Sequence, residues 1–322
     1  MRTICASEWI ARRPWCSGNI GTLGVSYHAN CQWRVAKLQP PSLKAMIPWE
    51  GRADLYRDQT FHGGVFAMGF LANWIATNMA HQVMGKPRSY NPGAFNNNML
   101  WQWATNNMDS EFWRARSADW SKTTVPFYSV GNWTGMGLHL RGNVEAFVNA
   151  ASQHKKLRIH SGSHFHPFHS NEGRAEQLRW FDHWLKGIDT GIMDEPPVKL
   201  EIRTGGSKKP YAFRAENEWP IARTQWTNFH LDPDNMGLSV HENNSIKTIT
   251  YDAMGDGVTF STPPLENETE ITGPSALKLF VSSSTADADL FVILRVFDPA
   301  GKEVLFQGAL DPKAAPPTAN GT

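Results

Sequence analysis

The sequence lacks an excess of either charge, because its 322 residues include 31 Lys and Arg against 30 Asp and Glu. A nucleic-acid-binding protein normally carries a basic excess, so this balance argues against nucleic acid as a partner. Cysteine is also scarce: there are three, at positions 5, 16 and 31, without regular spacing. This count and spacing do not predict a disulfide-stabilised scaffold.

Long hydrophobic runs are absent as well. No stretch approaches the roughly 18–20 apolar residues that a membrane-spanning helix needs, so we expect no membrane partner. The first 15 residues, MRTICASEWIARRPW, contain no hydrophobic signal core and predict a helix that ends at Pro14. On these grounds we expect a cytoplasmic protein.

Tryptophan, in contrast, is abundant: the chain has 14, many of them within residues 9–133. Clustered tryptophans can line a ligand cavity, but they can equally fill a core as large apolar side chains. The sequence leaves both alternatives open. With 41% hydrophobic and 19% charged residues, the composition is that of an ordinary globular protein.

Apolar patterning divides the chain into four predicted segments. Residues 1–50 alternate helix and strand, as in a parallel α/β unit, with strands in NIGTLGVS and LKAMIP. Residues 51–122 lose the strand signal and predict an inserted helical cap, including one long helix over GGVFAMGFLANWIATNMAHQVMG. Residues 123–192 resume the α/β pattern. Residues 193–322 predict an all-β sandwich or jelly roll. Its expected strands are VKLEIRT, TQWTNFHLD, IKTITYD, ALKLFVSSS and DLFVILRVFD.

A serine lies at the first predicted strand-to-helix turn, in GTLGVSYHAN, residues 21–30. A strand that leads into Gly-x-Ser and then a helix is the nucleophile elbow of α/β-hydrolases. Gly24 fits the motif two residues before Ser26, whereas His28 stands where the motif has its second glycine, followed by the small Ala29. The local pattern alone leaves open whether Ser26 is a nucleophile or an ordinary serine at a strand end.

A serine nucleophile needs a base, because its hydroxyl is a weak nucleophile at neutral pH. The predicted strand KLRIH opens into SGSHFHPFHS, a histidine-rich loop late in the α/β pattern. Its histidines are His160, His164, His166 and His169. His164, four residues beyond the strand, is the best candidate for the base. A metal site or a polar loop are the alternatives, but HExxH spacing and nearby cysteines are lacking, so we expect no metal and no cofactor.

Four longer segments resemble one protein family. WCSGNIGTLGVSYHANCQW, LKAMIPWEGRADLYRD, GNWTGMGLHLRGNVEAF and LRWFDHWLKGIDTGIMDEPPVKLEI are similar to the cocaine esterase and Xaa-Pro dipeptidyl-peptidase family of serine hydrolases, also called CocE/NonD-like. The resemblance extends from about Trp9 to about Gly308. It implies an α/β-hydrolase sheet, an inserted helical cap and a C-terminal jelly roll. It also implies Ser26 as nucleophile and His164 as base.

The acid of the catalytic triad is the main departure from the family. The resemblance places an aspartate at Thr134 or Gly135, and neither residue is a carboxylate. Glu50 follows the strand LKAMIP, and the carboxyl ends of parallel strands meet at one crevice. We therefore predict that Glu50 supports His164, with Asp54 as second choice. The alternative is that Glu50 caps or pairs with another group at the entrance to the cap.

The oxyanion hole is the second departure. In the family several strands precede the elbow and carry one oxyanion donor, a tyrosine hydroxyl in related enzymes. The backbone N–H of Tyr27 is the donor that remains, and losing one donor costs about 2.7–4 kcal/mol of transition-state stabilisation. We expect the strand of the elbow to lie at a sheet edge and the chain to be truncated at both ends relative to the family.

The leading functional prediction is a serine hydrolase that acts through an acyl-enzyme on a small ester, amide or short peptide. Esterase activity is favoured over dipeptidyl-peptidase activity, since no carboxylate pair for a substrate amine is evident. The predicted apolar pocket is lined by Trp74, Trp101, Trp103, Trp113, Trp120 and Trp133. The alternative is a non-catalytic degenerate hydrolase or a β-sandwich that binds carbohydrate or another ligand. Assembly into a homo-oligomer stays open.

Overall fold

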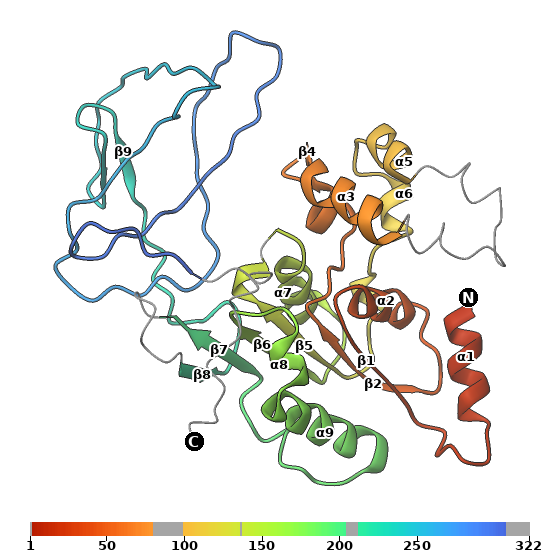
Figure 1. Ribbon diagram of the computed structural model, residues 1–322. Coiled ribbons are helices and arrows are strands. Elements are labelled where there is room, and N and C mark those ends of the chain that lie inside the picture. The colour runs from red at the N-terminus through yellow and green to blue at the C-terminus, as the bar shows by residue number, and fades with distance from the viewer. Residues whose placement is uncertain (1, 80–98, 136, 204–211, 307–322) are drawn as a thin grey trace. The chain divides into compact units, whose positions relative to one another are not determined.

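The computed structural model describes residues 2–79, 99–135, 137–203 and 212–306. The chain divides into two units by its internal contacts. The first comprises Met1–Trp219 with Leu305–Thr322, and the second comprises Pro220–Val304. The first unit contains the α/β core and the cap (Figure 1). None of the helices in the described ranges combines the length and apolarity that crossing a bilayer would require.

A six-stranded sheet forms the centre of the first unit, in the order β1-β2-β5-β6-β7-β8. The first five strands in this order pair in parallel, and β8 is antiparallel to β7. The strands are β1 (Ile20–Val25), β2 (Leu43–Trp49), β5 (Phe127–Asn132), β6 (Lys155–His160), β7 (Val198–Ile202) and β8 (Ala212–Glu216). Within the described part, β1 is an edge strand, as the sequence predicted.

Helices cover both faces of the sheet because side chains alternate along each strand. On one face, Met46 packs with Trp33 in a core shared by α2 (Tyr27–Ala36) and α7 (Leu140–Asn149). On the other face, Ile47 packs with Trp180 of α9 (Asn171–Lys186). Figure 1 shows α9 on the side of the sheet opposite α2 and α7. The N-terminal helix α1 (Arg2–Ala11) precedes Pro14, as expected.

The boundaries of α9 follow from its terminal residues. Ser170 Oγ accepts a hydrogen bond from the N–H of Gly173 at 3.0 Å and so caps the first turn. Gly187 ends the helix with φ 71°, a left-handed conformation that glycine adopts without strain. This helix holds the buried Trp180 against the sheet.

The cap is built from short elements rather than one long helix. The predicted helix from Gly63 is wrong at its start, because Gly63 and Gly64 have φ 60° and 94° and turn a two-stranded hairpin. Residues 80–85 of that prediction lie outside the described ranges. The elements are η1 (Tyr56–Thr60), β3 (Phe61–His62), β4 (Val65–Phe66), α3 (Met68–Trp74), η2 (Ile75–Met79), α5 (Met99–Thr105), α6 (Glu111–Arg114) and η5 (Trp120–Lys122).

Around residue 193, where the sequence analysis places the start of the β domain, the chain has not yet left the central sheet. The strand β7 pairs with β6, so the α/β sheet continues beyond that position, and the contact division falls after Trp219. An alternating apolar pattern marked VKLEI as a strand, but it does not tell which sheet the strand joins. That choice depends on which neighbouring backbone supplies the hydrogen-bond partners.

The second unit contains fewer strands than predicted. Its regular structure is the antiparallel pair β9 (His230–Asp232) and β10 (Gly237–Ser239). The predicted strands at 246–252, 276–284 and 289–298 have no regular ladder in the described chain, and Phe280 is 97% exposed. A strand persists only where a neighbouring backbone satisfies its N–H and C=O groups, and apolar alternation cannot supply that neighbour.

Candidate active site

The turn at Ser26 joins β1 to α2 in a strained conformation, with φ 61° and ψ −118°. Such values cost a non-glycine residue about 1–3 kcal/mol and concentrate at functional sites. The turn is held by backbone hydrogen bonds: Ser26 N–H donates to Trp49 O at 2.9 Å, and Ser26 O accepts from Asn30 N–H at 3.0 Å. This is the sharp strand-to-helix turn that exposes a nucleophile's hydroxyl.

Close packing explains the small residues around the turn. A Cβ at Gly24 would lie 2.4 Å from the Cβ of His28, so glycine at position 24 is what accommodates the unusual histidine. A Cβ at Gly51 would lie 2.5 Å from the Cβ of Ala29. Gly51 and Ala29 therefore let the end of β2 approach the first turn of α2.

Glu50 lies directly after β2, fully buried and with φ 47°. Its Oε2 accepts a hydrogen bond from His164 Nδ1 at 2.6 Å, and its Oε1 lies 3.1 Å from His160 Nε2. Asn132 Nδ2 donates to the same Oε1 at 3.3 Å. Burial raises the pKa of Glu50, but hydrogen bonds from His160 and His164 outweigh it and lower the pKa to about 2. Glu50 is therefore an ionised carboxylate near neutral pH.

The segment that carries Glu50 is fixed by neighbouring side chains. Gly51 N–H donates to Asn143 Oδ1 at 2.9 Å, and Trp33 Nε1 donates to Gly51 O at 3.2 Å. Ala53 N–H donates to Asp58 Oδ2 at 2.8 Å. These contacts come from α2, α7 and η1, so three elements hold the backbone on which Glu50 is mounted.

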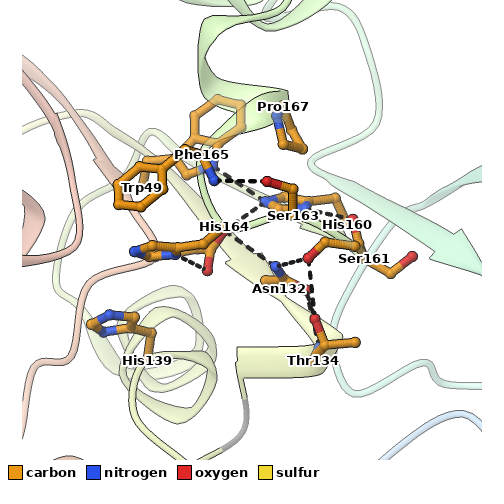
Figure 2. Close-up of polar contacts among 12 residues, drawn as sticks. Trp49, Asn132, Thr134, His139, His160, Ser161, Ser163, His164, Phe165 and Pro167 are labelled. Atoms are coloured by element: carbon orange, nitrogen blue, oxygen red, sulfur yellow. Dashed lines mark hydrogen bonds and ion pairs between the residues drawn. The ribbon is translucent and has the colours of Figure 1, made fainter. Parts of the chain in front are cut away.

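The loop that carries His164 is tied to strands on both sides of β6. Asn132 Nδ2 donates to Gly162 O at 3.0 Å, while Ser161 donates to the Glu201 carboxylate through its N–H at 2.8 Å and its hydroxyl at 2.7 Å. Figure 2 shows Asn132 and Thr134 beside this loop, below His164. These anchors orient the His164 ring toward Glu50.

A histidine that the sequence analysis did not select contacts the serine. His139 Nε2 lies 3.1 Å from Ser26 Oγ, and the His139 ring is parallel to that of His164, with centroids 5.4 Å apart (Figure 2). Within the described chain, His139 rather than His164 is the hydroxyl's hydrogen-bond partner. Burial, followed by the nearby charge of His164, lowers the pKa of His139 to about 3. The sequence did contain a signal for His139. This residue follows β5 by a few positions, so it lies beyond the carboxyl ends of the strands, where Ser26 and Glu50 also lie.

The other predicted polar candidates are paired with other groups or exposed to solvent. The Asp54 carboxylate accepts from the N–H groups of Tyr56 and Arg57 and pairs with the Arg57 guanidinium at 2.9 Å, so it caps η1. His166 and His169 are exposed on the short helix α8 (His166–His169). Among the described residues, no group of three or more His, Cys, Asp or Glu is arranged to hold a metal ion.

The predicted pocket tryptophans fall into different environments. Trp74 contacts the ring of Tyr27, next to Ser26, with centroids 6.5 Å apart. Trp101 is 66% exposed on α5, and Trp133 Nε1 donates to Glu201 O at 2.9 Å. Three other members belong to apolar cores instead, which is the alternative that the sequence left open: Trp103, Trp113 and Trp120.

A mainly parallel sheet, a strained serine elbow after one strand and a carboxylate–histidine pair that follows β2 and β6 define this chain as an α/β-hydrolase. Its sequence gives the family. Residues 4–166 match the X-Pro dipeptidyl-peptidase (S15) family, and residues 190–315 match the X-Pro dipeptidyl-peptidase C-terminal non-catalytic domain. The chain belongs to the S15 family, which confirms the predicted family and the predicted α/β-hydrolase class with a further C-terminal domain.

Several known proteins are similar to this chain. The cocaine esterase of Rhodococcus sp. (strain MB1 Bresler) is 23% identical, over 92% of this chain and 66% of that protein. A Bacillus cereus protein provisionally named Xaa-Pro dipeptidyl-peptidase is 24% identical, over 96% of this chain and 56% of its own length. The crystal structure of a CocE/NonD family hydrolase from Staphylococcus aureus superposes with a TM-score of 0.68 at 33% identity, over 76% of this chain and 42% of that one. The chain thus spans between 42% and 66% of the length of these three relatives.

Proposed function

We propose that this protein is a serine hydrolase that cleaves a small ester or amide through an acyl-enzyme. Ser26 is the nucleophile, His164 the base and Glu50 the acid of the triad. The observation that carries the proposal is the 2.6 Å hydrogen bond between Glu50 and His164, formed beside the strained elbow of Ser26. A carboxylate on one imidazole nitrogen fixes the tautomer and stabilises the imidazolium that forms during acyl transfer.

The mechanism follows from this geometry. Because Glu50 holds the proton on His164 Nδ1, the other ring nitrogen is the one that accepts the proton of Ser26 during attack. The tetrahedral oxyanion then forms near the first turn of α2, where the N–H of Tyr27 has no acceptor within the helix. The positive end of the α2 dipole adds to this stabilisation. Protonation of the leaving group by His164 and hydrolysis of the acyl-enzyme complete the cycle.

Ester substrates are favoured over Xaa-Pro peptides. A dipeptidyl-peptidase needs a carboxylate to bind the free amine of its substrate, and the three carboxylates within residues 50–58, just after β2, are engaged with other groups. Glu50 pairs with His160 and His164, Asp54 with Arg57, and Asp58 with Arg141 at 3.0 Å. We propose that the Trp74–Tyr27 pair contacts the apolar part of such an ester, with the exposed Trp101 and the Trp133 side chain as further candidates for the pocket.

The test is labelling with a fluorophosphonate probe, which requires an activated serine. We expect the chain to label, Ser26→Ala to abolish labelling, and Ser17→Ala, a change at an exposed serine before β1, to leave it unchanged. Hydrolysis of a p-nitrophenyl ester faster than an Xaa-Pro p-nitroanilide supports the esterase assignment, and the reverse order supports a dipeptidyl-peptidase. A folded chain that does not label supports a non-catalytic hydrolase fold.

We propose a cytoplasmic location, which cell fractionation tests. We also propose that the protein self-associates, with the side chain of Leu23, which is 42% exposed, as a candidate contact. Light scattering coupled to size-exclusion chromatography tests this, and a monomer at assay concentration contradicts it.

A further inference from the structure

His139 occupies an unusual place for a second histidine. It directly precedes α7, where its N–H donates to Gly135 O at 3.0 Å and its C=O accepts from Asn143 N–H at 3.4 Å. The side chain is 4% exposed, so its ring is taken out of water. Its position is therefore set by backbone contacts and burial, and its Nε2 is directed at Ser26 Oγ.

The protonation state of His139 follows from its two ring nitrogens. The Nδ1 is buried and has no hydrogen-bond partner in the described part of the chain, whereas Nε2 is 3.1 Å from the serine hydroxyl. A proton on Nδ1 would leave a buried N–H donor without an acceptor, which native structures rarely tolerate. A proton on Nε2 instead donates to Ser26 Oγ and leaves only a lone pair unpaired. The neutral form with the proton on Nε2 satisfies this site best.

The charged groups around His139 also favour its neutral form. The ring stacks on that of His164; the charges of His164 and Arg52 disfavour an imidazolium, and the Glu50 charge favours one. Burial is the largest influence, and together these effects lower the pKa of His139 to about 3. When His164 accepts a proton during catalysis, a second cation stacked on it would be repelled. His139 is thus suited to keep one proton throughout the reaction.

We propose that His139 is a neutral hydrogen-bond donor to Ser26 Oγ, and that the stacked His164, held by Glu50, takes the hydroxyl's proton. This inference rests on the proposed function and adds a residue to it. As Oγ bonds to the substrate carbonyl carbon, the hydroxyl proton passes to His164 Nε2 and the carbonyl π electrons move to the oxygen. On collapse the leaving group departs with the proton from His164. The Nε2–H of His139 stays in place and stabilises negative charge that develops on Oγ.

Substitutions of His139 can distinguish a hydrogen-bond donor from a base. Glutamine places a side-chain N–H close to where His139 Nε2 lies but cannot accept a proton at neutral pH, whereas alanine provides neither. We expect His139→Gln to keep fluorophosphonate labelling within about 10-fold of the unmodified chain and His139→Ala to slow it by about 10²–10³-fold. His166→Gln, at an exposed histidine, is the matched control and should have no effect. The acid limb of the pH–rate profile should be the same in His139→Gln as in the unmodified chain.

Two kinds of measurement can overturn this inference. If His139→Gln labels as slowly as His139→Ala, or if its acid limb moves, His139 is the base and the inference is overturned. A second measurement does not depend on activity: ¹⁵N NMR of histidine-labelled chain, with the His139 signal assigned by its loss in His139→Gln. The inference predicts a neutral ring with the proton on Nε2 from pH 5 to 8, and a proton on Nδ1 or a charged ring there overturns it. Absence of labelling in a chain with this NMR signature would overturn the proposed function instead.

Discussion

The Glu50 carboxylate lies in front of Gly135: a Cβ added to that glycine would be 3.6 Å from Glu50 Oε2. Gly135 is one of the two positions where the family resemblance places its aspartate. Strands β2 and β5 pair in parallel, with Trp49 opposite Val130, so residues just beyond their ends reach the same space. This placement supports the proposal that the triad acid comes from the strand next to the expected one.

Replacing Glu50 by glutamine removes the charge and keeps the shape. Because the amide no longer stabilises an imidazolium at His164, we expect ester turnover to fall by about 10³–10⁴-fold. The measurement is p-nitrophenyl ester hydrolysis at pH 7.5, with circular dichroism to verify folding. Asp54→Asn, which changes a carboxylate that caps η1, is the control, and it should lower ester turnover by less than about 10-fold. A folded Glu50→Gln chain with unchanged turnover contradicts the assignment of Glu50.

If the side chains at positions 50 and 135 reach the same space, a carboxylate at position 135 should replace that of Glu50. In a Glu50→Ala background, Gly135→Asp should restore ester turnover at least partly, by about 10-fold or more over Glu50→Ala alone, because the new carboxylate enters the vacated space. The matched control is Gly135→Asn in the same background, which has the same size and no charge. An aspartate that performs no better than the asparagine would show that the site does not accept a carboxylate from β5.

Acidification should destabilise the protein in a way that depends on His139. Its pKa falls from 6.5 to about 3 on folding, so between those values the unfolded state binds a proton that the native state does not. The free energy of unfolding should therefore drop as the pH falls below 6.5, by about 2 kcal/mol at pH 5 from this group alone. His139→Gln should show a correspondingly smaller decrease between pH 7.5 and 5 in urea denaturation. Equal decreases in both chains contradict the prediction.

Glu50 affects the free energy of unfolding at lower pH than His139 does. Its pKa is lowered to about 2 from 4.5, so its contribution to stability is complete above 4.5 and is lost as the pH falls toward 2. The slope between pH 7.5 and 5 therefore reports His139 without interference from Glu50.

The fit between Gly24 and His28 makes a prediction about the elbow itself. Gly24→Ala places a Cβ 2.4 Å from that of His28, and we expect overpacking to lower the free energy of unfolding by about 1–3 kcal/mol. In a His28→Gly background the same change should cost less, since the colliding atom is gone. A double-mutant cycle by urea denaturation measures the coupling. Gly69→Ala, on α3 with open space around it, is the control and should be neutral or stabilising. Equal costs in both backgrounds refute the contact.

The sequence predicted the elements that carry the site because each has a strong local signal. Apolar runs located β1, β2, β5 and β6, and Gly-x-Ser at a strand-to-helix junction located the elbow of Ser26. Glu50 and His164 each follow a predicted strand, and this position identified them as candidate partners because parallel strands converge at their carboxyl ends. The cap was harder, because Gly63 and Gly64 form a hairpin turn inside a sequence with helical periodicity.

What the sequence by itself determined is therefore local: where the chain turns, which residues alternate toward a core, and that Ser26, Glu50 and a histidine loop each follow a predicted strand. The tertiary structure decided which groups meet. Only packing of α7 against β5 brings His139 to Ser26 Oγ, and only burial makes that ring neutral. Hydrogen bonds, stacking and desolvation depend on distances across more than a hundred residues of chain, and no local pattern encodes those distances.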